Sequence, residues 1–155
     1  MFIRPKKTYT ICLQFTLQIY IECDIFDIAI CYKERKDMKL SKVKELLDAT
    51  VFAGESRIDE IEVTEACGSD LMSDVLAFVK DQGLMLTGHR NAQVVRTAEM
   101  MDMKAIVLVR GKTPSEEIIE IAEEGGIALM STEHPMFVAC GILYANGLKG
   151  GKAEE

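Results

Sequence analysis

The segment KAIVLVRGKTPSEE, from Lys104 to Glu117, carries the strongest fold signal in this chain. Its first half, 104–109, carries a continuous apolar run, which is typical of a parallel strand buried on both faces. Its second half contains Thr113-Pro114-Ser115-Glu116, a capping box with proline at the first helical position, which predicts a helix start. Gly125-Gly126 then predicts the end of that helix. A buried strand that leads directly into a helix is the building unit of α/β folds.

Outward from this unit, strand and helix patterns alternate from Met38 to Leu148. Further strands are predicted at 50–53, 60–66, 84–87 and 127–130. Further helices are predicted at 39–48, 69–80, 91–101 and 135–145. Ser69 and Asn91 are the expected capping residues of the second and third of these helices. The alternation predicts an α/β layered sandwich with a mainly parallel sheet.

The first 37 residues have a different composition from the rest. They hold three of the five cysteines and no glycine, and their apolar run, Ile11–Tyr32, is interrupted by three acidic residues. Those charges make the run a poor membrane span, and its alternating apolar residues are typical of a strand. We favour the interpretation that 1–37 is a peripheral extension upstream of a start at Met38. The domain is then expected at 38–148, with a flexible tail at 149–155.

Composition and charge narrow the class of protein. The chain has 155 residues, 48% hydrophobic and 28% charged, as in ordinary globular proteins. Its net charge of −7 disfavours binding to nucleic acid or to an anionic membrane, because both would repel it. Five cysteines without a CxxC pair, beside two histidines, predict neither a disulfide framework nor a metal site. A reducing, cytoplasmic compartment is therefore expected.

Three strand-to-helix turns are candidates for a ligand site, because ligands of open α/β sheets lie off the carboxyl ends of strands, beside helix N-termini. The turns are 67–70, 87–91 and 110–113. The last two hold three of only 12 basic residues after Met38, in a region with 20 acidic residues. Positive charge beside free helix N–H groups predicts an anion site, and a nucleotide phosphate is the natural anion. The candidate ligand residues are Ser69, Gly88, His89, Arg90, Arg110, Gly111 and Lys112.

Simpler readings of these residues stay open. Gly88 and Gly111 are also the residues that tight turns require, and the arginines could pair with acidic neighbours. Gly111-Lys112-Thr113 resembles the end of a phosphate-binding P-loop, but that motif needs a glycine five positions earlier, where Ile106 stands. No kinase or ATPase activity follows from it.

The remaining reactive side chains give no catalytic constellation. Cys67 and Cys140 each lie in Ala-Cys-Gly, which favours close packing, with a reactive Cys67 thiolate at a helix N-terminus as the alternative. Ser69 has no visible His–Asp partners, and His89 and His134 have no ligand-type partner at helical spacing. No catalytic residue, cofactor or metal is therefore expected.

Four blocks of this chain resemble the DRTGG domain family, which is named for separated residues. The resemblance covers residues 38 to about 148. Two positions depart from the family: its aspartate is His89 here, before Arg90, and its Thr-Gly is replaced by Val109-Arg110, before Gly111. The pair His89 and Arg110 favours a more anionic ligand. The blocks are Cys67–Leu76, Leu86–Val94, Val107–Gly111 and Ile118–Met130.

The resemblance implies a fold similar to the N-terminal domain of HPr kinase/phosphatase. It also implies a cytosolic, non-catalytic regulatory module, expected to be a homodimer, such as those beside paired CBS domains in inorganic pyrophosphatases. Together with the basic turns it favours sensing of a small anionic ligand, an adenine nucleotide or another phosphate-bearing metabolite. The alternative is an interaction or assembly protein that acts through dimerisation or a partner protein and binds no small ligand.

Overall fold

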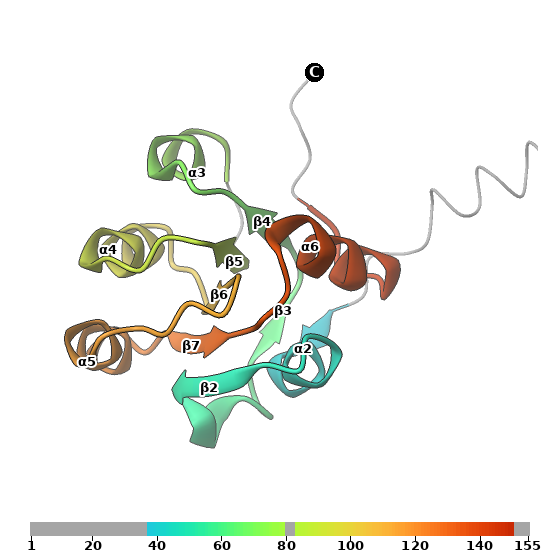
Figure 1. Ribbon diagram of the computed structural model, residues 1–155, viewed down its shortest axis with the longest axis horizontal. Coiled ribbons are helices and arrows are strands. Elements are labelled where there is room, and N and C mark those ends of the chain that lie inside the picture. Colours follow the sequence, from blue (N-terminus) through green and yellow to red (C-terminus); the bar gives the residue numbers. More distant parts are fainter. Residues whose placement is uncertain (1–36, 80–82, 151–155) are drawn as a thin grey trace, which may run out of the picture. The chain divides into compact units, whose positions relative to one another are not determined.

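Figure 1 shows the computed structural model, which describes residues 37–79 and 83–150. All of these residues belong to one compact unit, 35–155. The extension predicted at 1–37 lies outside the described residues except for Asp37, and so do residues 151–155 of the predicted tail.

The predicted α/β fold with a mainly parallel sheet is confirmed. Five strands form the main sheet in the order β2-β7-β6-β5-β4. The last four strands of that order are parallel to one another, and β2 pairs antiparallel with β7 at one edge. The strands are β2 (Thr50–Ala53), β4 (Ala66–Gly68), β5 (Leu84–Thr87), β6 (Ala105–Leu108) and β7 (Ala128–Ser131).

The single strand predicted at 60–66 is wrong, because the chain there contributes to two sheets. β3 (Glu62–Val63) pairs antiparallel with β1 (Met38–Lys39) in a separate two-stranded sheet. The chain joins the main sheet only at β4, after Glu65 has formed a bridge with Lys149. The main-chain N–H of Ala66 donates to the Lys149 carbonyl at 2.9 Å, so Lys149, predicted in the tail, pairs beside the edge strand.

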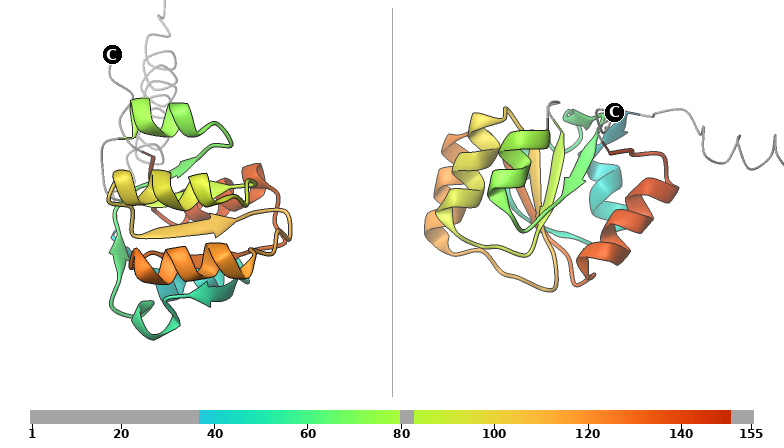
Figure 2. Two further views of the ribbon diagram at one scale, coloured as in Figure 1. Left: turned by 90° about the vertical axis from the view of Figure 1, so that its left-hand side faces the viewer. Right: turned by 90° about the horizontal axis from the view of Figure 1, so that it is seen from above.

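Helices cover both faces of the sheet (Figures 1 and 2). Neighbouring residues of each strand point to opposite faces. In β6, Ala105 and Val107 pack into one core cluster, while Ile106 and Leu108 pack into the other. This double burial explains the continuous apolar runs of the sequence. One face carries α3 (Met72–Phe78), α4 (Ala92–Met100) and α5 (Glu116–Glu124), and the other carries α2 (Leu40–Leu46) and α6 (Met136–Ala145).

The predicted cap of α4 is confirmed, whereas that of α5 is wrong. The Asn91 side chain accepts a hydrogen bond from the main-chain N–H of Val94 at 3.2 Å. Helix α5 begins at Glu116 with Ser115 as its N-cap, two residues later than the capping box predicted. Pro114 is not the first helical residue, because it lies in the connection that precedes the helix, where its side chain is buried.

The predicted start of α3 is also wrong. The Ser69 hydroxyl accepts from the N–H of Leu71 at 3.0 Å, which closes a local turn instead of capping a helix. The helix begins three residues after Ser69, at Met72. Helix α5 ends at the predicted Gly125-Gly126 pair, and α6 ends at Ala145, the last residue of the range predicted for it. Within residues 37–79 and 83–150, no helix has the length and apolar character needed to cross a membrane.

Candidate functional site

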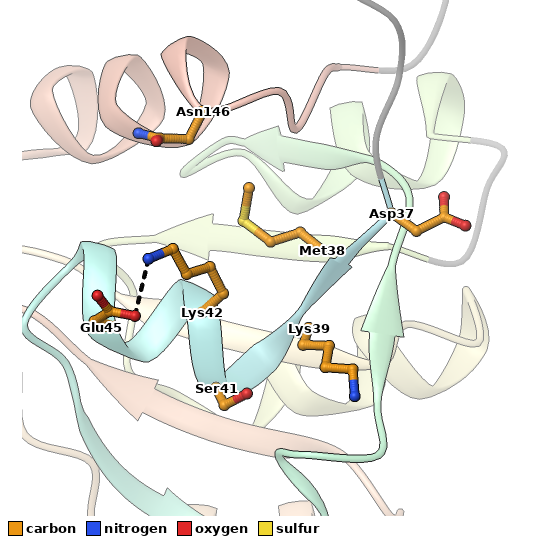
Figure 3. Close-up of a pocket in the computed structure, with 7 residues that line it drawn as sticks. All are labelled: Asp37, Met38, Lys39, Ser41, Lys42, Glu45 and Asn146. Carbon is orange, nitrogen blue, oxygen red and sulfur yellow. Dashed lines mark hydrogen bonds and ion pairs between the residues drawn. The ribbon is translucent and has the colours of Figure 1, made fainter.

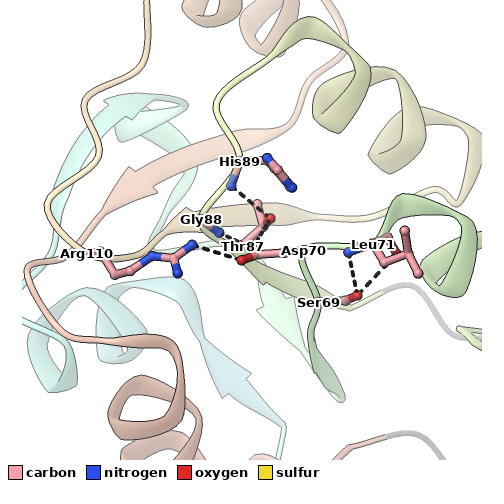
Figure 4. A network of polar contacts seen from close by, with 7 residues as sticks. All are labelled: Ser69, Asp70, Leu71, Thr87, Gly88, His89 and Arg110. Carbon is pink, nitrogen blue, oxygen red and sulfur yellow. Dashed lines mark hydrogen bonds and ion pairs between the residues drawn. The ribbon is translucent and has the colours of Figure 1, made fainter.

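The three turns predicted to carry a ligand site lie at one edge of the sheet. Strands β4, β5 and β6 are parallel neighbours, so their carboxyl ends point the same way. The pairing continues past the strands, because the N–H of Ser69 donates to Leu86 and that of Val109 donates to Thr87, both at 3.0 Å. The three turns therefore lie side by side (Figure 4).

Asp70 joins the three turns into one polar network. Its Oδ1 accepts hydrogen bonds from the main-chain N–H of Gly88 at 2.6 Å and from the Thr87 hydroxyl at 3.1 Å. Its Oδ2 accepts from the Arg110 guanidinium at 2.9 Å (Figure 4). One carboxylate from the β4 turn is thus held by donors from the β5 and β6 turns.

These contacts keep Asp70 ionised. Partial burial alone would raise the pKa of this carboxyl group. The hydrogen bonds from Gly88, Arg110 and Thr87, together with the positive charge of Arg110, outweigh burial and hold the pKa of Asp70 below its usual value. Asp70 is consequently a carboxylate at neutral pH.

Arg110 has an unusual backbone conformation for its side-chain type. Its φ is 66°, in the left-handed region that residues with a Cβ rarely adopt. The other described non-glycine residues with positive φ are Asp48 and Asp102, a type that tolerates this region. The Arg110 N–H donates to the His134 carbonyl at 2.9 Å, and this bond helps to hold the conformation. Strained residues of this kind cluster at functional sites.

Gly88 allows the close approach of the Arg110 side chain. A Cβ built on Gly88 would overlap the Arg110 guanidinium. The guanidinium therefore lies directly over the main chain of the β5 turn, and a larger residue at position 88 would push this flexible side chain aside. Gly111 follows Arg110 with a φ of 62° and lies against the carboxylate of Glu133.

The other predicted ligand residues take different positions. Arg90 donates to the Thr113 carbonyl at 3.3 Å, which links the β5 and β6 turns. His89 and Lys112 are exposed, and the Lys112 carbonyl accepts from the Ser131 hydroxyl at 2.8 Å. The alternative that an arginine pairs with an acidic neighbour is confirmed for Arg110, whose partner is Asp70. Asp70, the central residue of the network, lies in the predicted 67–70 turn but is not among the predicted ligand residues.

The alternative of a reactive Cys67 thiolate is wrong. Cys67 lies in β4, and α3 begins five residues later, so no helix N-terminus stabilises its thiolate. Burial, with a smaller contribution from Cys140, raises the pKa of the Cys67 thiol to about 11. Both thiols line a cavity of about 250 Å³ between β4 and α6. A protonated thiol is a poor nucleophile and a poor metal ligand.

A second cavity, of about 350 Å³, lies where β1 leads into α2 (Figure 3). Lys42 and Glu45 on its wall form an ion pair at 2.9 Å, and Asn146 contributes from the end of α6. This cavity contains none of the predicted ligand residues. In the part of the chain that the structure describes, no three His, Cys, Asp or Glu side chains are grouped as a metal ion would need.

Comparison with known proteins identifies the class. The sequence profile of the DRTGG domain matches residues 42–144, about two thirds of the sequence, so the chain belongs to the DRTGG domain family. None of the curated proteins matches the sequence.

A solved structure shares the fold: the CBS and DRTGG domains of the regulatory region of Clostridium perfringens pyrophosphatase, complexed with its activator, diadenosine tetraphosphate. Its TM-score is 0.60 at 20% sequence identity. The match covers 78% of this chain and 56% of that one, so this chain spans little more than half of its length. The domain described here is thus a DRTGG domain, and its fold is that of the solved DRTGG structure.

Proposed function

We propose that this domain is a non-catalytic, cytoplasmic regulatory module that binds a phosphate-bearing anion, with an adenine nucleotide as the first ligand to test. The site is the edge formed by the turns after β4, β5 and β6. One observation carries the proposal: the N–H of Gly88 and the guanidinium of Arg110 together hold both oxygens of a carboxylate. A main-chain N–H beside an arginine is the donor set that phosphoryl oxygens accept.

Two further features support this ligand class. Arg90 and Lys112 lie on the same turns and add positive charge to a domain that is otherwise acidic. The pyrophosphatase regulatory region that shares the fold was solved with a dinucleotide activator. Its ligand motivates the inclusion of adenine nucleotides among the compounds tested.

The test is a thermal-shift and calorimetric titration of the full chain with AMP, ADP, ATP, diadenosine tetraphosphate and inorganic phosphate. A ligand at 100 times its Kd should stabilise the fold by about 2.7 kcal/mol. The double variant Arg90→Ala/Arg110→Ala should lose that shift, whereas Arg96→Ala, an exposed arginine on α4, should keep it. If none of these compounds moves the melting curve of the wild-type chain, the proposal is wrong.

A second candidate function, assembly as a homodimer, is favoured by the outer face of α6. Phe137 is 89% exposed and Tyr144 is 52% exposed, and no charged residue lies between Met136 and Ala145. In a chain with a net charge of −7, a charge-free helix is the surface on which two copies meet with least repulsion. Light scattering should give the dimer mass, which Phe137→Glu abolishes and Met100→Glu, at an exposed position on α4, leaves intact.

A further inference from the structure

Asp70 occupies the position that an anionic ligand would need. Both of its oxygens are taken up by the donors of the proposed site, the N–H of Gly88 and the Arg110 guanidinium, with the Thr87 hydroxyl as a third donor. We propose that Asp70 is an intramolecular competitor, which fills the anion site of the free protein and gives it up to the ligand. This inference rests on the proposed function of the same site.

The position of the Asp70–Arg110 ion pair at the surface allows both side chains to exchange partners. The Arg110 and Asp70 side chains are 48% and 41% exposed, and an ion pair this open to water is weak. The backbone around it is held independently, because the N–H groups of Arg110 and Gly111 donate to the carbonyls of His134 and Thr132 at 2.9 and 3.0 Å. Release of Asp70 therefore leaves the main chain of Arg110 in place, from which its guanidinium can turn to a new acceptor.

An internal carboxylate also sets the specificity of the site. A ligand must displace a singly charged group that is tethered beside its donors. A carboxylate ligand offers the same charge and the same two oxygens, so it gains little over Asp70. A phosphoryl group carries a charge of about −1.5 to −2 and three acceptor oxygens, and it suits the fork of an arginine. The site should accordingly select phosphoryl groups over carboxylates.

Displacement of Asp70 would also transmit the binding event. Asp70 lies between β4 and α3, and the Ser69–Leu71 hydrogen bond closes the adjoining turn. Freed from Gly88 and Arg110, Asp70 no longer ties this connection to the β5 and β6 turns. The β4–α3 connection is thus the segment whose environment differs between the free and bound states.

The first experiment measures affinity in the full chain for AMP, inorganic phosphate and succinate by calorimetry. Asp70→Asn and Asp70→Ala should bind AMP and phosphate about three- to tenfold more tightly than the wild type, because no competitor has to leave. They should also bind succinate measurably. Asp74→Asn, at an exposed position of α3, makes the same charge change without the contact and should match the wild type.

A second experiment uses the unmodified chain, so it does not depend on a variant that folds. On saturation with AMP, the carboxyl ¹³C resonance of Asp70 should move while that of Asp74 stays in place. Two results would contradict the role of Asp70 as a competitor but not the proposed function. One is an Asp70 resonance that does not move on AMP binding. The other is an affinity of the Asp70 variants that is no higher than that of Asp74→Asn. Absence of AMP and phosphate binding in the wild type and in every variant would instead overturn the proposed function, and this inference with it.

Discussion

Helices α5 and α6 follow neighbouring strands, but they cover opposite faces of the sheet. They also differ in the kind of side chain that they expose to solvent. Helix α6 buries Ala139 and Leu143 and exposes Phe137 and Tyr144, with no charge on either side. Helix α5 buries Ile118 and Ala122 beneath a charged outer surface. The exposed carboxylates of α5 are Glu116, Glu117, Glu120, Glu123 and Glu124.

A surface helix contributes apolar side chains to the core and also forms part of the solvent-facing surface. Both helices complete the core with an inner stripe of apolar residues, but only α5 finishes the surface with groups that water solvates well. An apolar outer face contributes nothing to the stability of the isolated domain. Its presence on α6 therefore favours a contact with another molecule, as in the assembly candidate.

The largest expected effect compares the two sides of α6. Leu143→Ala should lower the free energy of unfolding by about 2–5 kcal/mol, because it leaves a cavity in the core. Phe137→Ala removes a larger side chain but should change the stability of the monomer by only about 0.5 kcal/mol or less. Urea unfolding at low protein concentration measures both. A large loss in Phe137→Ala would show that its side chain is covered within the chain.

The next prediction compares the two Ala-Cys-Gly tripeptides, one in β4 and one in α6. Burial raises the pKa of Cys67 to about 11 from a usual value of 9.0, so its thiolate fraction at pH 8 falls about a hundredfold. Alkylation of Cys67, followed by mass spectrometry, should slow by a similar factor in the native protein. Burial also raises the pKa of Cys140, but less strongly, so Cys140 should react faster than Cys67.

Urea supplies the control for this comparison, because unfolding removes burial and should make the two alkylation rates equal. Reaction of native Cys67 at its unfolded rate would show that the β4 thiol is accessible and ionised.

A smaller effect compares the starts of α4 and α5. Asn91→Ala should destabilise the domain by about 1 kcal/mol, because the side chain caps the N–H of Val94. Ser115 holds the same position in α5 but makes no capping hydrogen bond. Ser115→Ala should therefore destabilise the domain by only a few tenths of the loss expected for Asn91→Ala. Thermal unfolding of the two variants tests the pair. Equal losses would indicate that Ser115 caps α5 in solution.

Much of this fold is predictable from sequence because its central strands are buried on both faces. Segments such as 84–87 and 105–108 read as continuous apolar runs, and the alternating helices then require parallel pairing. The order of the strands is not predictable in this way, because it depends on contacts between distant segments. The split of 60–66 between two sheets has the same cause, since the pairing partners β1 and β5 lie elsewhere in the chain.

The site is predictable to a lesser degree. The meeting of three turns follows from parallel strands and helix starts, and the glycines and arginines mark those turns. The Asp70–Arg110 pair spans 40 residues and depends on the register of three strands, which no local pattern encodes. Ser69 and Thr113 mislead for a related reason, because a residue type that suits an N-cap also suits the turn before a helix. The role of the seven candidate residues in binding stays a prediction.

The smallest expected effect concerns the turn that leads into α3, which covers the same face of the sheet as α5. Because the pKa of Asp70 is lowered in the folded protein, its contacts contribute stability that is fully present above the unfolded value near 3.8. That contribution is lost as the pH falls through the folded pKa. The melting temperature of the wild type should therefore exceed that of Asp70→Asn by a small margin at pH 6.

The margin should shrink below pH 4, because the stabilising contribution of the Asp70 carboxylate is lost there. The partial exposure of both partners keeps the effect small, since water screens the pair. A margin between the wild type and Asp70→Asn that stays the same from pH 6 to pH 3 would mean that the Asp70 carboxylate does not hold Arg110 in solution. In that case the donors of Gly88 and Arg110 would stand open to any anion, and the site would lose its means of preferring phosphoryl groups to carboxylates.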